Sequence, residues 1–282
     1  KAYSDKTKGA DFVEFLRRRL IIAKEILCDD GLIAVHLDWK KGHYINLILD
    51  EIFGEQNFIN EIIWHYTGNS VPVKSFPKKH DLVYLYYKSV APLFNFGDVL
   101  EPYSERTLKR YNHTDEEGKS YKISALRNGK QEIVFAKEGK YPDDVWDIPV
   151  PRQKNEIVNY PTQKPEDLIK KLILATTNKN DIVLDFFGGS GTTAAVAEKL
   201  NRKWITCDIG KLSFYTIQKR LLNIEGSKSL ENSKKEYGKP AKSFITVNTG
   251  HYDLEKVFNL EQEKYIDFVT NLFEVETKKK TI

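Results

Sequence analysis

The chain has 282 residues, of which 40% are hydrophobic and 30% are charged, with a net charge of +4 and a pI near 8.7. This length supports a full hydrophobic core, and the composition fits an ordinary soluble protein. The small positive excess tolerates a polyanionic partner without requiring one. No run reaches the ~18 apolar residues of a membrane helix and no signal peptide is recognisable, so we expect a cytoplasmic protein with no membrane partner.

The cysteines, histidines and methionines set further limits. Cys28 and Cys207 cannot form a disulfide framework, and because both lie in apolar stretches we interpret them as buried thiols. The six histidines show no ligand spacing with one another or with cysteine, so we predict no metal. The chain contains no methionine and begins at Lys1, so we expect further sequence upstream.

The first predicted unit, residues 1–88, alternates helical and strand-like periodicity. Apolar residues at helical spacing predict two helices, and β-branched and aromatic runs predict three strands. In chain order these are a helix at 11–27, a buried strand at 32–38, a helix at 43–54 and strands at 61–66 and 81–87. The alternation predicts an α/β fold with a mostly parallel sheet.

The later part of the chain divides into three predicted units. Residues 89–152 lack a long period and are interpreted as an insertion. Residues 153–224 return to the α/β pattern, with helices at 165–178, 192–200 and 211–224 and strands at 181–187 and 203–209. Residues 225–282 form a predicted C-terminal extension, in which a polar loop precedes a strand and amphipathic helices.

A glycine-rich corner, "DFFGGSGTT" at 185–193, joins a predicted strand to a predicted helix. Glycines allow close approach of a ligand, and free N–H groups at the helix start favour a negative ligand group. The next strand ends at Asp208, whose carboxylate could accept both hydroxyls of a ribose. These features predict the adenosine-binding half of a Rossmann-like unit, with a ligand-free βα turn as the alternative. The spacing departs from G-x-G-x-x-G and argues against a nicotinamide cofactor.

The corner resembles motif I of the S-adenosylmethionine-dependent DNA amino-methyltransferases, which methylate adenine N6 or cytosine N4. Upstream, "YPTQKPEDLI" at 160–169 resembles motif X of the same family. The order of these motifs is that of the permuted, beta-type enzymes, which include the modification subunits of type III restriction systems. The resemblance covers about residues 1–222 and implies a permuted Rossmann-like fold.

The resemblance also implies a set of cofactor-binding residues. Asp208 would hold the ribose of S-adenosyl-L-methionine, and Lys164 would pair with its carboxylate. The methionine and adenosine moieties would lie against Asp185, Phe186, Gly188, Ser190, Gly191, Thr192 and Thr193. The methionine end would be closed by Thr162, Gln163, Lys164 and Pro165.

The catalytic residues implied by the resemblance are absent from the chain. The family signature is Asp-Pro-Pro-Tyr or a variant, whose acid and prolyl carbonyl accept hydrogen bonds from the target amine. "DIPV" at 147–150 lacks the paired prolines and the aromatic ring. In the permuted order the signature precedes this region, so we expect it upstream of Lys1. A catalytically inactive subunit that binds S-adenosylmethionine or DNA is the alternative.

Double-stranded DNA is the expected substrate, with adenine N6 favoured over cytosine N4. Base extrusion needs aromatic contacts and phosphate binding needs cations. Residues of this kind are Trp64, Tyr66, Lys74, Phe76, Lys79, His80, Arg106, Lys109 and Arg110. The insertion at 89–152 would then hold the target-recognition region, although its mixed charges equally fit a solvated surface. A restriction subunit and a homodimer are compatible partners. The rival activities are methylation of RNA or protein and nicotinamide-dependent oxidoreduction.

Overall fold

The computed structural model describes residues 9–68, 74–126 and 128–248. The chain divides into two units, residues 1–241 and residues 242–282. The first unit contains all the helices and strands of the described residues. In the second unit, the described residues 242–248 form no helix or strand, so the strand predicted there is not found. The helices predicted beyond residue 248 lie outside the described residues.

The first sheet has four strands in the order β1-β3-β2-β7. β1 (Leu32–Asp38) and β2 (Phe58–His65) both run antiparallel to β3 (His80–Tyr87), and only β7 (Val145–Asp147) is parallel to its neighbour β2. The sheet is therefore mixed, and the expectation of a mostly parallel sheet is not met here. The described residues between β2 and β3 contain no crossover helix, so the chain returns antiparallel to itself.

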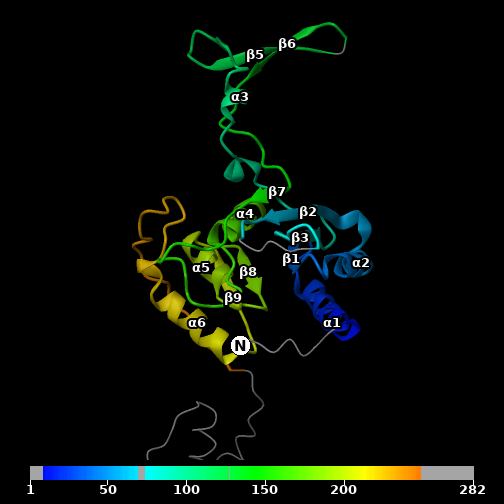
Figure 1. Cartoon of the computed structure of the whole chain (residues 1–282), viewed down its shortest axis with the longest axis vertical. Coiled ribbons are helices and arrows are strands. Elements are labelled where there is room, and N and C mark those ends of the chain that lie inside the picture. The colour runs from blue at the N-terminus through cyan, green and yellow to red at the C-terminus, as the bar shows by residue number, and fades with distance from the viewer. Residues whose placement is uncertain (1–8, 69–73, 127, 249–282) are drawn as a thin grey trace, which may run out of the picture. The chain divides into compact units, whose positions relative to one another are not determined.

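Helices cover both faces of this sheet (Figure 1). On one face, α1 (Ala10–Ile26) and α2 (Gly42–Phe53) pack against aromatic side chains of β3 that include Tyr84 and Tyr86. On the other face, α4 (Glu166–Thr176) packs against the residues of opposite parity in β2 and β3. The period of two in β3 thus assigns alternate residues to two different cores.

A second, two-stranded sheet carries the glycine corner. β8 (Ile182–Asp185) pairs in parallel with β9 (Lys203–Thr206), and α5 (Thr192–Lys199) makes the crossover between them. α5 packs against α4 and α6 (Lys211–Leu222) follows β9. On this small sheet Ile182, Leu184 and Ile205 are 63%, 39% and 54% exposed. Among the described residues, β1 pairs with β3 alone and β8 pairs with β9 alone, so each has a free edge.

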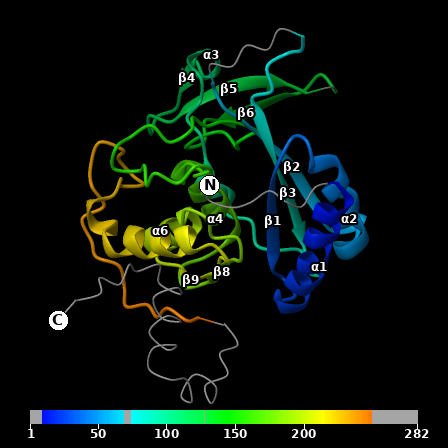
Figure 2. The same ribbon diagram turned by 60° about the horizontal axis from the view of Figure 1, so that its bottom comes forward.

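The expected insertion contains a third sheet (Figure 2). β5 (Ser120–Ala125) lies between β4 (His113–Thr114) and β6 (Gln131–Phe135), and all pairings are antiparallel. The short helix α3 (Glu105–Leu108) precedes this sheet, and three 3-10 turns complete the elements: η1 (Glu55–Asn57), η2 (Phe96–Val99) and η3 (Ile224–Gly226). β7 lies inside the segment assigned to the insertion, yet it belongs to the main sheet.

The two cysteines are exposed, so the prediction of buried thiols is wrong. Cys28 follows the end of α1 and Cys207 follows the end of β9. Each thiol therefore lies just past the apolar element that suggested its burial. None of the helices in the described residues combines the length and the apolar character needed to cross a membrane.

Candidate functional site

The glycine corner folds tightly against the end of β9. The N–H of Gly188 donates to the carbonyl oxygen of Cys207 at 2.9 Å, and the N–H of Gly191 donates to that of Gly188 at 2.7 Å. A Cβ at Gly188 would lie 2.4 Å from the hydroxyl oxygen of Thr206, so no side chain fits there. Gly189 and Gly191 have φ angles of 52° and 71°, a region that glycine adopts without strain.

Asp208 faces the corner from the end of β9. One carboxylate oxygen accepts the N–H of Gly189 at 2.8 Å and the other accepts the N–H of Gly210 at 2.7 Å. Each oxygen keeps a further lone pair, and the residue is exposed, so it can still accept the hydroxyls of a ribose. No side chain caps the N-terminus of α5, which leaves N–H groups of its first turn directed at the same corner.

The other acid of the corner, Asp185, is the last residue of β8. Its carboxylate accepts the N–H of Phe187 at 3.0 Å and so bends the chain away from the strand. The ring of Phe187 is 49% exposed and lies 6.3 Å, centroid to centroid, from the ring of Phe15 in α1. The half-buried Phe186 lies 5.0 Å from Phe187. The corner therefore adjoins the first helix of the chain.

The structure brings together the two segments that carry the resemblance. The hydroxyl of Thr192 donates to the carbonyl oxygen of Lys164 at 3.2 Å, across 28 residues of sequence. The hydroxyls of Ser190 and Thr192 lie 2.9 Å apart, and both residues are buried. "TQKP" is thereby fixed directly beside the glycine corner.

Several of the predicted cofactor residues have side chains that point into the protein. The amide of Gln163 accepts the N–H of Val158 at 2.9 Å and donates to the carbonyl oxygen of Glu156 at 2.7 Å. Pro165 is fully buried, and Ser190 and Thr192 are buried with 6% and 4% of their surface exposed. The side chains of Gln163, Pro165, Ser190 and Thr192 therefore support the site from the protein interior. Gln163 is nevertheless half-buried, and the other exposed or half-buried side chains are those of Thr162, Lys164, Asp185, Phe186, Thr193 and Asp208.

A polar cluster on the first sheet meets Lys164. Asp81 opposes Trp64 on β2 and Asp38 on β1, so residues two positions away, such as His36 and Tyr66, share its face. One oxygen of Asp81 lies 3.0 Å from Nε2 of His36 and 3.5 Å from Nζ of Lys164. The other accepts the hydroxyl of Tyr66 at 3.3 Å. The Asp81 side chain is 11% exposed and that of Lys164 is 36% exposed.

The protonation states in this cluster follow from its geometry. Burial opposes ionisation of Asp81, but the hydrogen bond to His36 and the charge of Lys164 outweigh it, and the pKa of Asp81 lies below its ordinary value. Burial lowers the pKa of His36, and the hydrogen bond to Asp81 only partly opposes this effect. At neutral pH the cluster therefore contains an ionised Asp81 beside a neutral His36.

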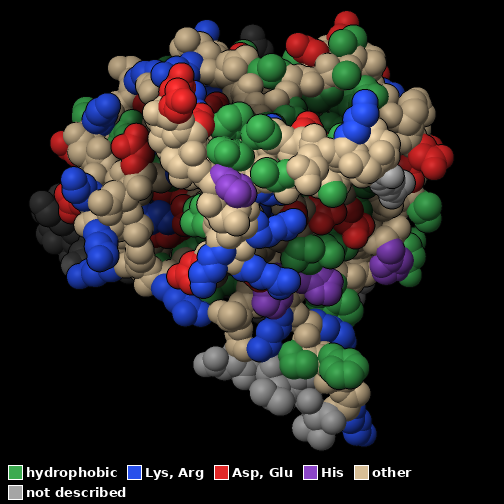
Figure 3. Space-filling model, turned by 90° about the horizontal axis from the view of Figure 1, so that it is seen from above, with side chains coloured by type: hydrophobic (Ala, Val, Ile, Leu, Met, Phe, Trp, Pro, Cys, Tyr) green, Lys and Arg blue, Asp and Glu red, His purple; other side chains and the backbone are tan. Residues whose placement is uncertain are grey.

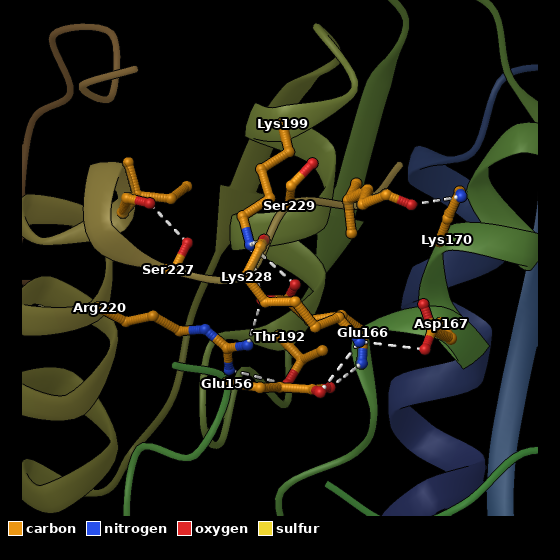
Figure 4. A network of polar contacts seen from close by, with 12 residues as sticks. Glu156, Glu166, Asp167, Lys170, Thr192, Lys199, Arg220, Ser227, Lys228 and Ser229 are labelled. Atoms are coloured by element: carbon orange, nitrogen blue, oxygen red, sulfur yellow. Dashed lines mark hydrogen bonds and ion pairs between the residues drawn. The ribbon is translucent and has the colours of Figure 1, made fainter. Parts of the chain in front are cut away.

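A buried ion network supports the corner from inside (Figure 4). Glu166, the first residue of α4, is fully buried and binds Nζ of Lys199 at 2.7 Å and Nη2 of Arg220 at 2.8 Å. The other guanidinium nitrogen, Nη1 of Arg220, donates to the hydroxyl of Thr192 at 3.0 Å and to the carbonyl oxygen of Ser190 at 3.1 Å. Two charged side chains thus connect α4, α6 and the corner.

The segment after α6 joins the same region. Nζ of Lys228 is buried and lies 3.0 Å from carboxylate oxygens of both Glu156 and Asp167. Burial lowers the pKa of Lys228, but the two carboxylates outweigh it and the pKa lies above its ordinary value. The carbonyl oxygen of Lys228 also accepts a hydrogen bond from Lys199 at 2.7 Å. Part of the expected extension is therefore integral to the first unit.

Sequence reasoning missed this network, although signals for it exist. Glu166 appears in the sequence as one of two acids in a first helical turn, which a helix dipole alone explains. Arg220 precedes the apolar run "LLNI" on a helix that must pack somewhere. A charged residue flanked by core positions is a reason to look for a buried partner.

The residues predicted to contact DNA fall into two groups. Trp64 is 2% exposed, and its ring N–H donates to the carbonyl oxygen of Ile148 at 2.7 Å, so it belongs to the core. Tyr66 is half-buried beside Asp81, whose carboxylate accepts its hydroxyl. The remaining predicted residues are exposed or half-buried: Lys74, Phe76, Lys79, His80, Arg106, Lys109 and Arg110. On the face in Figure 3, basic side chains and histidines gather beside acidic side chains that lie in a hollow.

The described residues contain no group of three or more His, Cys, Asp or Glu side chains arranged to hold a metal ion.

Comparison with known proteins identifies the family. The family model for DNA methylases matches residues 1–219. The chain is 28% identical to the type II methyltransferase M.EcaI of Enterobacter cloacae, over 78% of this chain and 59% of that protein. It is also 28% identical to the DNA adenine methyltransferase YhdJ of Escherichia coli, over 70% of this chain and 63% of YhdJ. The chain thus spans less than two thirds of the length of these relatives.

A solved structure agrees with this assignment. The complex of M1.HpyAVI with S-adenosylmethionine superposes with a TM-score of 0.51 and 24% sequence identity, covering 76% of this chain and 85% of that chain. This similarity shows a shared fold. The family model covers most of the chain and confirms the family expected from the sequence: the chain belongs to the S-adenosylmethionine-dependent N6-adenine/N4-cytosine DNA methylases.

Proposed function

We propose that the chain forms the cofactor-binding and target-recognition part of a site-specific DNA methyltransferase. The enzyme would transfer a methyl group from S-adenosylmethionine to the exocyclic amine of a base in duplex DNA, with adenine N6 favoured. The observation that carries the proposal is the meeting of the uncapped α5 corner, Asp208 and Lys164 at one site.

The donor set at this site fits S-adenosylmethionine. Asp208 has free lone pairs for the ribose hydroxyls, and the N–H groups at the start of α5 can meet polar groups of the nucleoside. Phe186 offers an aromatic surface beside the corner, and Lys164 offers a cation for a carboxylate. When bound, the cofactor supplies a methyl group activated by its sulfonium centre.

We place the catalytic acid-and-proline motif in a segment preceding Lys1, as the permuted order implies. Within the part of the chain that the structure describes, β1 and β8 each have an edge without a neighbouring strand, which supports this placement because each edge can accept one more strand. The exposed apolar residues Ile182, Leu184 and Ile205 also fit a small sheet that belongs to a larger one. Strands buried on both faces read as continuous apolar runs, and "IVLD" of β8 is such a run.

Target recognition is proposed for the insertion at 89–152. Three exposed cations, Arg106, Lys109 and Arg110, cluster on and just after α3 and could contact phosphates. The third sheet of the insertion carries partly exposed aromatic side chains that include Tyr121 and Phe135. A restriction subunit remains a proposed partner. The name of YhdJ gives adenine as its target and supports adenine here.

Transfer of a labelled methyl group tests the proposal. The protein expressed from the full reading frame should move label from S-adenosylmethionine into duplex DNA, and digestion should yield N6-methyladenine. Label in N4-methylcytosine would change the target base alone. Retained cofactor binding without transfer to DNA or RNA would favour the inactive subunit. Absence of S-adenosylmethionine binding by calorimetry would refute the proposal.

A further inference from the structure

Lys164 and Asp81 form a pair of opposite charges at the edge of the proposed cofactor site. Their Nζ and carboxylate oxygen are 3.5 Å apart. The backbone of Lys164 is fixed beside the corner by the hydroxyl of Thr192 at 3.2 Å. Asp81 is fixed on the sheet by His36 and Tyr66. The pair therefore joins the two halves of the described α/β unit.

Neither member of the pair has used all of its hydrogen-bonding capacity. An ammonium has three N–H donors, and Asp81 engages one of them. The carboxylate accepts His36 and Lys164 at one oxygen but only Tyr66 at the other, which leaves a lone pair there. The side chain of Lys164 is 36% exposed, and that of Asp81, although mostly buried, keeps 11% of its surface exposed.

The charges of the cluster leave the pair electrically neutral. His36 is neutral at pH 7, and the Tyr66 hydroxyl is raised in pKa by burial and by Asp81, so neither changes the charge count. A neutral pair of adjacent opposite charges is complementary to a ligand that is itself zwitterionic. An α-amino acid carries its ammonium and its carboxylate on one carbon, and binding one here buries no net charge.

We propose that Asp81 and Lys164 together bind the amino-acid end of S-adenosylmethionine, with Asp81 accepting the α-ammonium and Lys164 binding the α-carboxylate. This inference rests on the proposed function, because it assigns a further residue to the same site. It adds Asp81, which lies outside the motif I segment at 185–193 and the motif X segment at 160–169.

Four nucleosides that share the adenosine and thioether groups separate the two contacts. S-adenosylhomocysteine carries both charges, its decarboxylated form keeps only the amine, its deaminated form keeps only the carboxylate, and 5′-methylthioadenosine has neither. Asp81→Asn should weaken the two amine-bearing ligands by about tenfold or more, the effect of removing one charged hydrogen bond. The other two ligands should keep their affinity. Lys164→Met should weaken the two carboxylate-bearing ligands instead.

Asp50→Asn is the matched control, because Asp50 is half-buried and accepts the hydroxyl of Tyr86 at 2.7 Å on the other face of the sheet. Its ligand affinities should equal those of the wild type by calorimetry. If Asp81→Asn lost the same affinity for all four ligands, Asp81 would only support the structure of the site and would not bind the ammonium. Unchanged affinity for S-adenosylhomocysteine would overturn the assignment.

Lys164→Met provides a second route if Asp81→Asn does not fold. Removing the cation frees Asp81, so the decarboxylated nucleoside should bind as well as before or more tightly. A loss for this ligand would contradict the proposal. A wild-type protein that binds none of the four nucleosides would instead refute the adenosine site itself, and with it the proposed function.

Discussion

Arg220 and Glu166 lie 54 residues apart in sequence and form a fully buried ion pair, with 2.8 Å between Nη2 and Oε1. The same guanidinium binds the hydroxyl of Thr192, which in turn donates to the carbonyl oxygen of Lys164. One arginine therefore sets the position of both segments that carry the resemblance. The shape of the proposed cofactor site therefore depends on buried charges behind it.

Removal of this arginine should destabilise the protein strongly. Arg220→Met leaves Glu166 fully buried with Lys199 as its remaining cation, and breaking a buried pair costs about 3–5 kcal/mol. Urea unfolding should show this destabilisation. Arg18→Met removes a surface ion pair with Glu14 on α1, and it should leave the midpoint of urea unfolding unchanged. Equal midpoints for the two variants would show that the buried pair adds no stability.

Asp208→Ala should weaken S-adenosylmethionine binding by at least about 1.5 kcal/mol, because charge-assisted hydrogen bonds to the ribose are removed. Calorimetry on the folded variant measures this directly. Asp143→Ala removes an exposed carboxylate that pairs with Lys140, and it should bind as the wild type does. Wild-type affinity in Asp208→Ala would refute the ribose assignment.

Stability should fall as the pH drops through the range in which His36 titrates. Burial lowers the pKa of His36 in the folded state, so the unfolded chain binds the proton more readily. Stability is therefore complete above the unfolded pKa of about 6.5 and declines below it, by at most about 1.4 kcal/mol per pH unit. Thermal unfolding between pH 7.5 and 5.5 should show this slope. His36→Gln should flatten it, and an unchanged slope would assign the effect to other groups.

The three cations at α3 should contribute to DNA affinity without base preference. Replacing Arg106, Lys109 and Arg110 by alanine should weaken binding and lower the log–log salt slope by about 0.9 for each phosphate that is no longer neutralised. Fluorescence anisotropy at several salt concentrations gives the slope. Lys234→Ala with Lys235→Ala, on the exposed segment after η3, serves as a control that also removes surface cations. If both variants showed the same log–log salt slope, the cations at α3 would not contact the DNA.

Periodicity predicted the long helices well, and α1 shows why, because it buries one stripe that contains Leu16, Leu20 and Ala23. The helices expected at 11–27 and 192–200 are observed as Ala10–Ile26 and Thr192–Lys199. Strand direction was harder to predict. An apolar run such as "LIAVHLD" has the same pattern in parallel and antiparallel sheets, and only the connection between β2 and β3 decides which one forms.

The candidate site was predicted in part for a similar reason. Local signals located the corner and Asp208, because strand, turn and acid follow one another in the sequence. Asp81 and Arg220 meet their partners only after folding, so spacing along the chain does not tell which residues they pair with. Ser190 and Gln163 show the converse, since their position in the motif suggested ligand contacts while their side chains bond inside the protein.

Among residues 9–68, 74–126 and 128–248, β1 and β8 each have one edge that pairs with no other strand, and this has a practical consequence for handling the protein. An unpaired strand edge presents N–H and C=O groups that can form hydrogen bonds with a strand of another molecule. Ile182 and Leu184 also expose apolar surface on β8. Preparations of residues 1–282 alone should therefore self-associate at high concentration. A charged substitution such as Ile182→Lys should reduce this self-association.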